Sequence, residues 1–313
     1  MNSIKFQQAF LSCFILSVLF ILPPCRCLGA DKLNVVTTTP TFASIAESVG
    51  GEHVSVTSIG SGDEDPHFIQ AKPSYMMKAR KADLWICVGM ELEIGYEGLI
   101  LQGSRNTRIQ INTPGHLDAS EGIMKLEVPT GKIDRSMGDV HPLGNPHYWL
   151  DPYNGKIIAK NICQRLKQLD PEHAGDYDRN LAAFLSKLDN AMAGWVAKLK
   201  PFEHSKIVIY HRSWPYFANR FNLDVVAELE PKPGIPPGPG HILEVINIMK
   251  SEKARVILME PFYNRDDAEA VAKKTGAKVV VVPNAVNEQV KDYIAMLDNV
   301  VNRLSEALSE VSK

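Results

Sequence analysis

Three histidines in this chain lie where a ligand could reach them together. His67 comes just after the strand pattern HVSVTSIG, His211 directly follows the apolar run KIVIY, and His147 lies in the stretch GDVHPLGNPHYWLDP. In an open parallel sheet, ligands bind at the edge formed by the carboxyl ends of the strands. Imidazole is a common ligand of transition metals. The three match no local zinc motif, however, and a single histidine in a loop is usually a surface or hydrogen-bonding residue.

The stretch 138–152 is rich in glycine and proline, which forbid a regular helix or a central strand. Within it, His141 is interpreted as a residue that hydrogen-bonds inside the loop or makes a transient contact. Tyr148 and Trp149 are interpreted as packing residues, and Asp151 is placed to cap the following helix. The six histidines outside the first set are interpreted as surface or locally hydrogen-bonded residues: His53, His116, His141, His173, His204 and His241.

The surrounding elements alternate between strands and helices, and the strands are continuous Val/Ile runs. This pattern is typical of parallel sheets that are covered on both faces. A strand is also expected over RIQI (108–111), and residues 112–146 are expected to be a loop. Near the middle of the chain, after Asp170, apolar residues recur at helical spacing until Pro201. This spacing predicts one helix of about 28 residues.

We therefore predict an α/β fold in which two lobes with parallel sheets are joined by one long rigid helix. The ligand site is expected in the cleft between the lobes. The expected parts are a signal peptide (1–30), an N-terminal α/β lobe (31–169), the linking helix (170–200) and a C-terminal α/β lobe (201–313).

The N-terminus has the pattern of a secretory signal. Lys5 precedes an apolar run over 9–22, and Pro23 and Pro24 then break any helix before a small-residue segment. The run is shorter than the roughly 20 residues that span a membrane. Cys25 and Cys27 lack the small-residue motif expected before a lipidated cysteine, so an unmodified secreted form is favoured. Cys87 is expected to be a buried strand residue and Cys163 to lie in a helix, so no disulfide framework is expected.

The charge balance argues against nucleic acid as a partner. The formal net charge is −2, and no basic patch interleaved with aromatic residues is present.

Several stretches carry a resemblance to a known family: DEDPHFIQAKPS, NPHYWLDP, YHRSWPYFANRF, ELEPKPGIPPGPGH and TGAKVVVV. Over nearly all of the chain that follows the signal, the sequence resembles the substrate-binding proteins of zinc/manganese uptake transporters of the ATP-binding-cassette (ABC) type. The resemblance implies a periplasmic protein, monomeric and without enzymatic activity, that binds a metal between two lobes and delivers it to a membrane permease.

Carried over to this sequence, the resemblance implies that His67, His147 and His211 are metal ligands. The family's fourth ligand is often an Asp after the last strand, and here that strand leads into Asn284. The fourth ligand therefore stays open among Asn284, Glu260, Asp65 and water.

Three imidazoles suit Zn²⁺ better than Mn²⁺, which prefers more oxygen ligands. Zn²⁺ is the expected metal, with Mn²⁺ or Fe²⁺ as alternatives. Zinc-binding members of this family often have a loop rich in His and Asp that collects metal. The equivalent region here has few such residues: His116, Asp118, Asp139 and His141. Because free imidazole is protonated below about pH 6.5, affinity is expected to fall there.

Two other functions are compatible with the same residues. Three protein ligands and an open position also describe a catalytic zinc site, so a secreted zinc-dependent hydrolase is one alternative, with Asp65 or Glu260 as the base. A metal-binding adhesin on the same scaffold is the other. The sequence contains no nucleophile elbow and no His-Glu-x-x-His helix motif.

Overall fold

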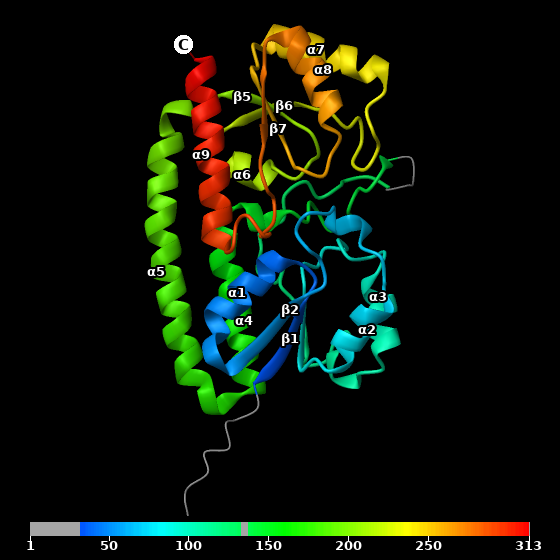
Figure 1. Ribbon diagram of the computed structural model, residues 1–313, viewed down its shortest axis with the longest axis vertical. Helices are drawn as coiled ribbons and strands as arrows, with labels where there is room; N and C mark the ends of the chain where they lie inside the picture. Colours follow the sequence, from blue (N-terminus) through cyan, green and yellow to red (C-terminus); the bar gives the residue numbers. More distant parts are fainter. Residues whose placement is uncertain (1–31, 133–136, 313) are drawn as a thin grey trace, which may run out of the picture. The chain divides into compact units, whose positions relative to one another are not determined.

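The chain builds two parallel four-stranded sheets, each covered by helices (Figure 1). The computed structural model describes residues 32–132 and 137–312, so the predicted signal peptide lies outside the described residues. In those described ranges, none of the helices combines the length and the apolar character needed to cross a membrane.

The first sheet and its helices form what we call the N-lobe. Its strands are ordered β2-β1-β3-β4, with bounds β1 Leu33–Thr37, β2 Val54–Ser58, β3 Leu84–Cys87 and β4 His116–Asp118. Its helices are α1 Pro40–Gly50, α2 Pro73–Arg80 and α3 Glu97–Ser104. Alternate strand residues face opposite sides of the sheet. Leu84 and Ile86 accordingly pack in the core that contains α1, whereas Trp85 and Cys87 pack with residues of α2 and α3.

The second sheet and its helices form the C-lobe. Its strands are ordered β6-β5-β7-β8, with bounds β5 Lys206–Ile209, β6 Asp224–Glu228, β7 Val256–Met259 and β8 Lys278–Val281. Its helices are α6 Pro215–Arg220, α7 Pro239–Glu252 and α8 Arg265–Thr275, and the chain ends in α9, Tyr293–Val311. All registered neighbours in both sheets run parallel.

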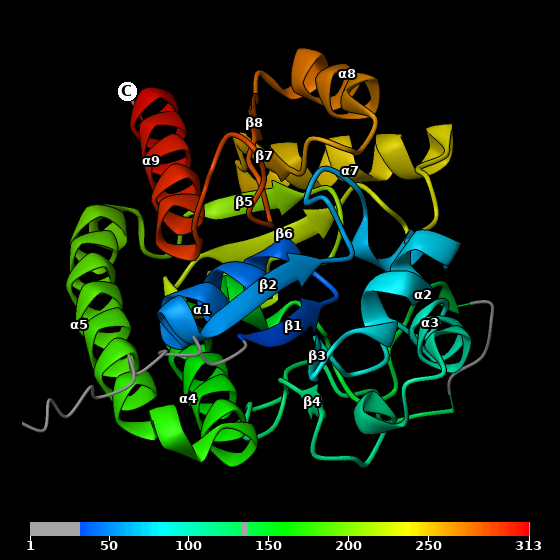
Figure 2. The same ribbon diagram turned by 60° about the horizontal axis from the view of Figure 1, so that its bottom comes forward.

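Two helices connect the lobes. α4, Pro152–Leu169, is followed by α5, Ala174–Leu199, whose 26 residues span about 39 Å at 1.5 Å per residue. α5 packs against α1, α4 and α9 and runs beside both sheets (Figures 1 and 2). One apolar core continues from the N-lobe sheet through these helices to the C-lobe sheet, and Lys32–Lys313 form one compact unit.

The predicted fold class, two α/β lobes with parallel sheets and one long helix, is confirmed. The domain boundaries at 169/170 and 200/201 stay a prediction. The strand expected over 108–111 is wrong, because Thr107–Ile109 forms a 3-10 turn and the fourth strand is β4. The Asn106 side chain accepts from the Arg108 N–H and starts that turn, which buries Ile109 and leaves Ile111 exposed.

Candidate metal centre

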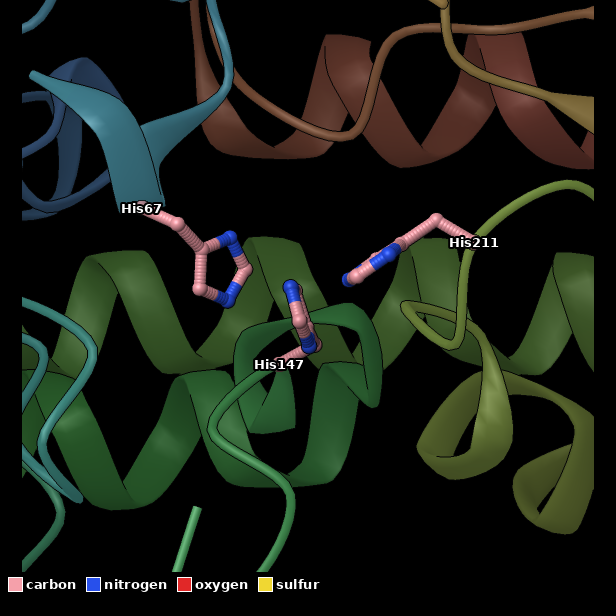
Figure 3. A group of neighbouring side chains, drawn as sticks. All are labelled: His67, His147 and His211. Atoms are coloured by element: carbon pink, nitrogen blue, oxygen red, sulfur yellow. The ribbon is translucent and has the colours of Figure 1, made fainter. Parts of the chain in front are cut away.

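The three predicted histidines come together from three separate segments. His67 lies in a 3-10 turn, Pro66–Phe68, after β2; His147 precedes another, Tyr148–Leu150; and His211 follows β5. Each offers one nitrogen, and these three atoms lie within 4.8 Å of one another. Figure 3 shows the rings converging, and their centroids are 5.1 to 5.4 Å apart.

The Nδ1 atom of each ring forms a hydrogen bond with a side-chain oxygen on the side away from the centre. The partners are Asp65 for His67 at 2.7 Å, Asn145 for His147 at 3.0 Å and Glu230 for His211 at 2.6 Å. In a neutral imidazole, an acceptor at Nδ1 places the ring proton there and leaves the Nε2 lone pair free for a metal. The three lone pairs therefore point into a common space, which is the arrangement by which histidines bind a metal.

The protonation of the rings differs with their surroundings. Burial, together with the charges of His67 and His211, lowers the pKa of His147 well below its usual value, so this ring is neutral at pH 7. Burial alone would lower the pKa of His211, but its hydrogen bond and charge interaction with Glu230 outweigh burial and raise that pKa. His211 therefore holds a proton more strongly than His147 does.

Asp65 is ionised beneath His67. Burial acts to raise its pKa, but the hydrogen bond and the charge interaction with His67 are stronger and lower the pKa to about 2. Its other carboxylate oxygen accepts from the Tyr263 hydroxyl at 3.0 Å. Both oxygens are thus engaged, and Asp65 positions His67 rather than offering a free ligand atom.

His141 is a fourth imidazole at this centre that the sequence interpretation left in the loop. Its Nε2 atom lies 3.1 Å from Nε2 of His67. Nitrogens bound to one tetrahedral zinc at 2.0–2.1 Å are about 3.4 Å apart, so this separation is close to that of two ligands of one ion. Burial and the charges of His67 and His211 lower the pKa of His141 to about 4. The signal available in the sequence was that His141 lies six residues before His147 in the same stretch rich in glycine and proline.

The other candidates for the fourth position lie less favourably. Asn284 is buried beyond β8, and its backbone carbonyl accepts from the Trp149 indole at 2.7 Å. Glu260 is fully buried, and neither of its oxygens has a hydrogen-bond partner among the described residues. Burial raises the pKa of Glu260 to about 7. Among the described residues at this centre, the His, Cys, Asp and Glu donors whose ligand atoms all lie within 4.8 Å of one another are His67, His147 and His211, and His141 lies beside this group, next to His67.

A cavity of about 230 Å³ opens beside the imidazoles, and residues from both lobes line it. His67 and His141 border it from the N-lobe side and His211 from the C-lobe side. Beside it, Arg212 forms two hydrogen bonds of 2.9 Å with the Glu127 carboxylate, which joins the two sides. The centre therefore lies between the lobes, beside a cavity that residues of both lobes line.

Comparison with known proteins places these features in a family. The family model described as "Zinc-uptake complex component A periplasmic" matches residues 35–307. The "High-affinity zinc uptake system protein ZnuA" of Brucella suis biovar 1 (strain 1330) is 32% identical over 168 residues, which is 52% of this chain and 50% of that protein. The chain thus spans about half the length of the first curated relatives it matches.

Other relatives match over nearly the full length. The "Manganese ABC transporter substrate-binding lipoprotein scaA" of Streptococcus gordonii is 25% identical over 289 residues, 90% of this chain and 91% of that protein. A solved structure, "Crystal structure of ZnuA", superimposes with a TM-score of 0.75 at 25% identity and covers 88% of this chain and 99% of that one.

Proposed function

This chain belongs to the family of the periplasmic zinc-uptake complex component A, and from that membership we propose that it captures a divalent transition metal, Zn²⁺ foremost, for delivery to an ABC-type membrane permease. The resemblance found in the sequence is confirmed by the family match. The observation that most supports capture is the set of three Nε2 atoms that converge while every Nδ1 atom is held.

The geometry favours binding because little has to move. The three ligand atoms lie at most 4.8 Å apart, and around zinc they need to be about 3.4 Å apart. Acceptors at Nδ1 fix the orientation of each ring and raise its basicity, as in other histidine metal sites. The histidine side chains thus lose their conformational entropy when the chain folds, and little more is lost when the metal binds.

We infer that His141 contributes to the fourth position more readily than Asn284. In the metal-free chain, Nε2 of His67 and Nε2 of His141 share a hydrogen bond of 3.1 Å. An arriving metal replaces this hydrogen bond, and the His141 ring is then within reach of the ion. The link between Asn284 and the described residues of the centre is its backbone carbonyl, which accepts from the Trp149 indole. A nitrogen-rich ligand set of this kind suits Zn²⁺ better than Mn²⁺ or Fe²⁺.

The cellular setting is part of the same proposal. A metal bound between two lobes needs a partner to receive it, and we propose the permease of an ABC transporter. The predicted signal peptide implies a periplasmic location. We propose a monomer in which α5 serves as the rigid connection between residues 31–169 and 201–313.

The zinc hydrolase alternative finds no support at this centre. A metal-bound water needs a general base within hydrogen-bond reach. Asp65 has both oxygens engaged, and Glu260 lies fully buried.

The proposal is tested by titrating the chelator-stripped chain with Zn²⁺ and Mn²⁺ against a chromophoric chelator. We expect one tight zinc site that is weakened by each of His67→Ala, His147→Ala and His211→Ala. His204→Ala is the matched control, because the His204 side chain is 77% exposed. Zinc affinity that is indifferent to the three substitutions would overturn the ligand assignment.

A further inference from the structure

A second group of metal-binding side chains lies in the N-lobe, away from the histidine centre. Cys87, Glu97 and His116 offer a thiol, a carboxylate and an imidazole, and their ligand atoms all lie within 4.8 Å of one another. We call this group the N-lobe cluster. None of the three belongs to the predicted cargo site, although Cys87 also packs in the core beneath α2 and α3.

The strand register explains why these side chains meet. β3 and β4 are parallel neighbours in which Trp85 is opposite His116 and Cys87 is opposite Asp118. Residues two apart on a strand share a face, so Cys87 and His116 project from the same side of the sheet. α3 covers that side, and Glu97 is its first residue.

The distances are close to those of a tetrahedral zinc site. Sγ of Cys87 is 3.9 Å from Nε2 of His116, and that nitrogen is 3.0 Å from Oε1 of Glu97. Zn–S and Zn–N bonds of about 2.3 and 2.0–2.1 Å place sulfur and nitrogen about 3.6 Å apart and nitrogen and oxygen about 3.4 Å apart. Shifts of about 0.4 Å would therefore bring His116 to the ligand–ligand spacing of a zinc site with both Cys87 and Glu97, and the third pair, Cys87 and Glu97, lies within 4.8 Å.

The donor chemistry also fits a divalent cation. A thiolate and a carboxylate together balance a charge of +2, and sulfur with imidazole nitrogen is the ligand combination that selects zinc-like ions over magnesium or calcium. The Trp85 indole donates to Glu97 at 2.8 Å and fixes the carboxylate. Such a partner behind a ligand is typical of metal sites.

One polar atom beside the cluster is left without a partner. The Tyr96 hydroxyl is fully buried and has no hydrogen-bond partner among the described residues. Its titratable neighbours include Cys87, Glu93 and Glu97. An unpartnered buried hydroxyl costs free energy. A metal-bound water at the fourth position would supply the missing partner.

The cluster is partly exposed on the side of Glu97 and His116. The side chains of Glu97 and His116 are 17% and 9% exposed, whereas Cys87 lies beneath them at 2%. The sulfur is thus protected from solvent, and the carboxylate and imidazole form the exposed side.

We propose that Cys87, Glu97 and His116 form a second metal site, one that takes Zn²⁺ or a similar thiophilic divalent cation. This site is independent of the cargo site, because it uses none of the histidines assigned there. It makes the chain capable of holding two ions.

The test uses residues 31–313, the chain without the predicted signal peptide and its three cysteines, with the cargo site removed by His147→Ala and His211→Ala. Cobalt(II) is titrated into the chelator-stripped protein, and the thiolate-to-cobalt charge-transfer absorption in the near ultraviolet is recorded. We expect the band to appear and saturate at one equivalent, to vanish with Cys87→Ser and to weaken with His116→Gln. Cys163→Ser is the matched control, since Cys163 is the other buried free cysteine of the described chain, and the band should persist there.

Folding of each variant is checked by circular dichroism, and Zn²⁺-induced stabilisation against heat gives an independent reading. Zinc should raise the melting temperature of the cargo-site variant and should lose this effect with His116→Gln, which retains the thiol. Absence of the cobalt band, or a band that survives Cys87→Ser, would overturn the proposal. Either result would leave the cargo site untouched.

Discussion

Glu230 makes the shortest of the three contacts that hold the imidazoles, 2.6 Å from Nδ1 of His211, and both side chains are at most 6% exposed. Glu230→Gln keeps the shape of this side chain and an oxygen that can accept, but it removes the charge. Loss of such a partner typically weakens metal binding by about 10–100-fold, or about 1.4–2.8 kcal/mol. We expect zinc affinity at pH 8 to fall by an amount in this range.

The pH dependence of zinc affinity gives a second test of the same prediction. The pKa of His211 is raised above 6.5 by Glu230, so protons compete with the metal for this ring already above that pH. Without the charge, burial lowers the pKa of His211, and proton competition begins at lower pH. The native chain therefore loses affinity earlier on acidification, and the gap between native and variant narrows as pH falls from 8 to 6.

Competition titrations at several pH values measure this gap. Glu244→Gln is a suitable control, because Glu244 contacts His241 with a carboxylate that is 67% exposed. A Glu230→Gln variant that binds zinc as tightly as the native chain at pH 8, or a gap that widens on acidification, would refute the reasoning.

Three further changes test other parts of the structure. His141→Ala should weaken zinc binding in competition titrations if the ring joins the metal, whereas tighter binding would mean that it only occupies the lone pair of His67. Asp151 caps α4 by accepting from the Tyr153 N–H and also pairs with Arg220 at 2.7 and 2.8 Å. Asp151→Ala should therefore lower the free energy of unfolding by about 1 kcal/mol more than Asp151→Asn, which can still cap; equal losses in urea unfolding would exclude a capping role. Leu188→Ala in α5 removes a fully buried side chain and should cost about 2–5 kcal/mol in the same assay; a loss below 1 kcal/mol would mean that α5 is not held by this core.

The sequence predicted those features that depend on periodic patterns. Val/Ile runs between helical segments indicated the parallel sheets, and regular apolar spacing indicated α5. The positions of His67 and His211 after strands followed from the same pattern, and so did the expectation that they could meet. Asp151 was placed correctly as a helix cap, because that role depends only on its immediate neighbours.

Features that depend on long-range contacts were not predictable in this way. The side chain behind each imidazole comes from its own loop or from another strand end, as Glu230 does for His211. His141 and His67 lie in two different loops, and no repeating pattern in the sequence predicts that these loops meet. The strand expected over 108–111 failed because apolar residues also occur in turns where one of them is buried. Asn284 as a ligand stays a prediction.

The most direct test of the account is the zinc X-ray absorption spectrum of the complex with one equivalent of Zn²⁺. We predict a first shell of nitrogen at about 2.0–2.1 Å, with the multiple scattering that imidazole rings produce and no sulfur. A sulfur shell at about 2.3 Å would show that the ion enters the N-lobe cluster first. A shell of oxygen without imidazole scattering would contradict capture by His67, His147 and His211 altogether.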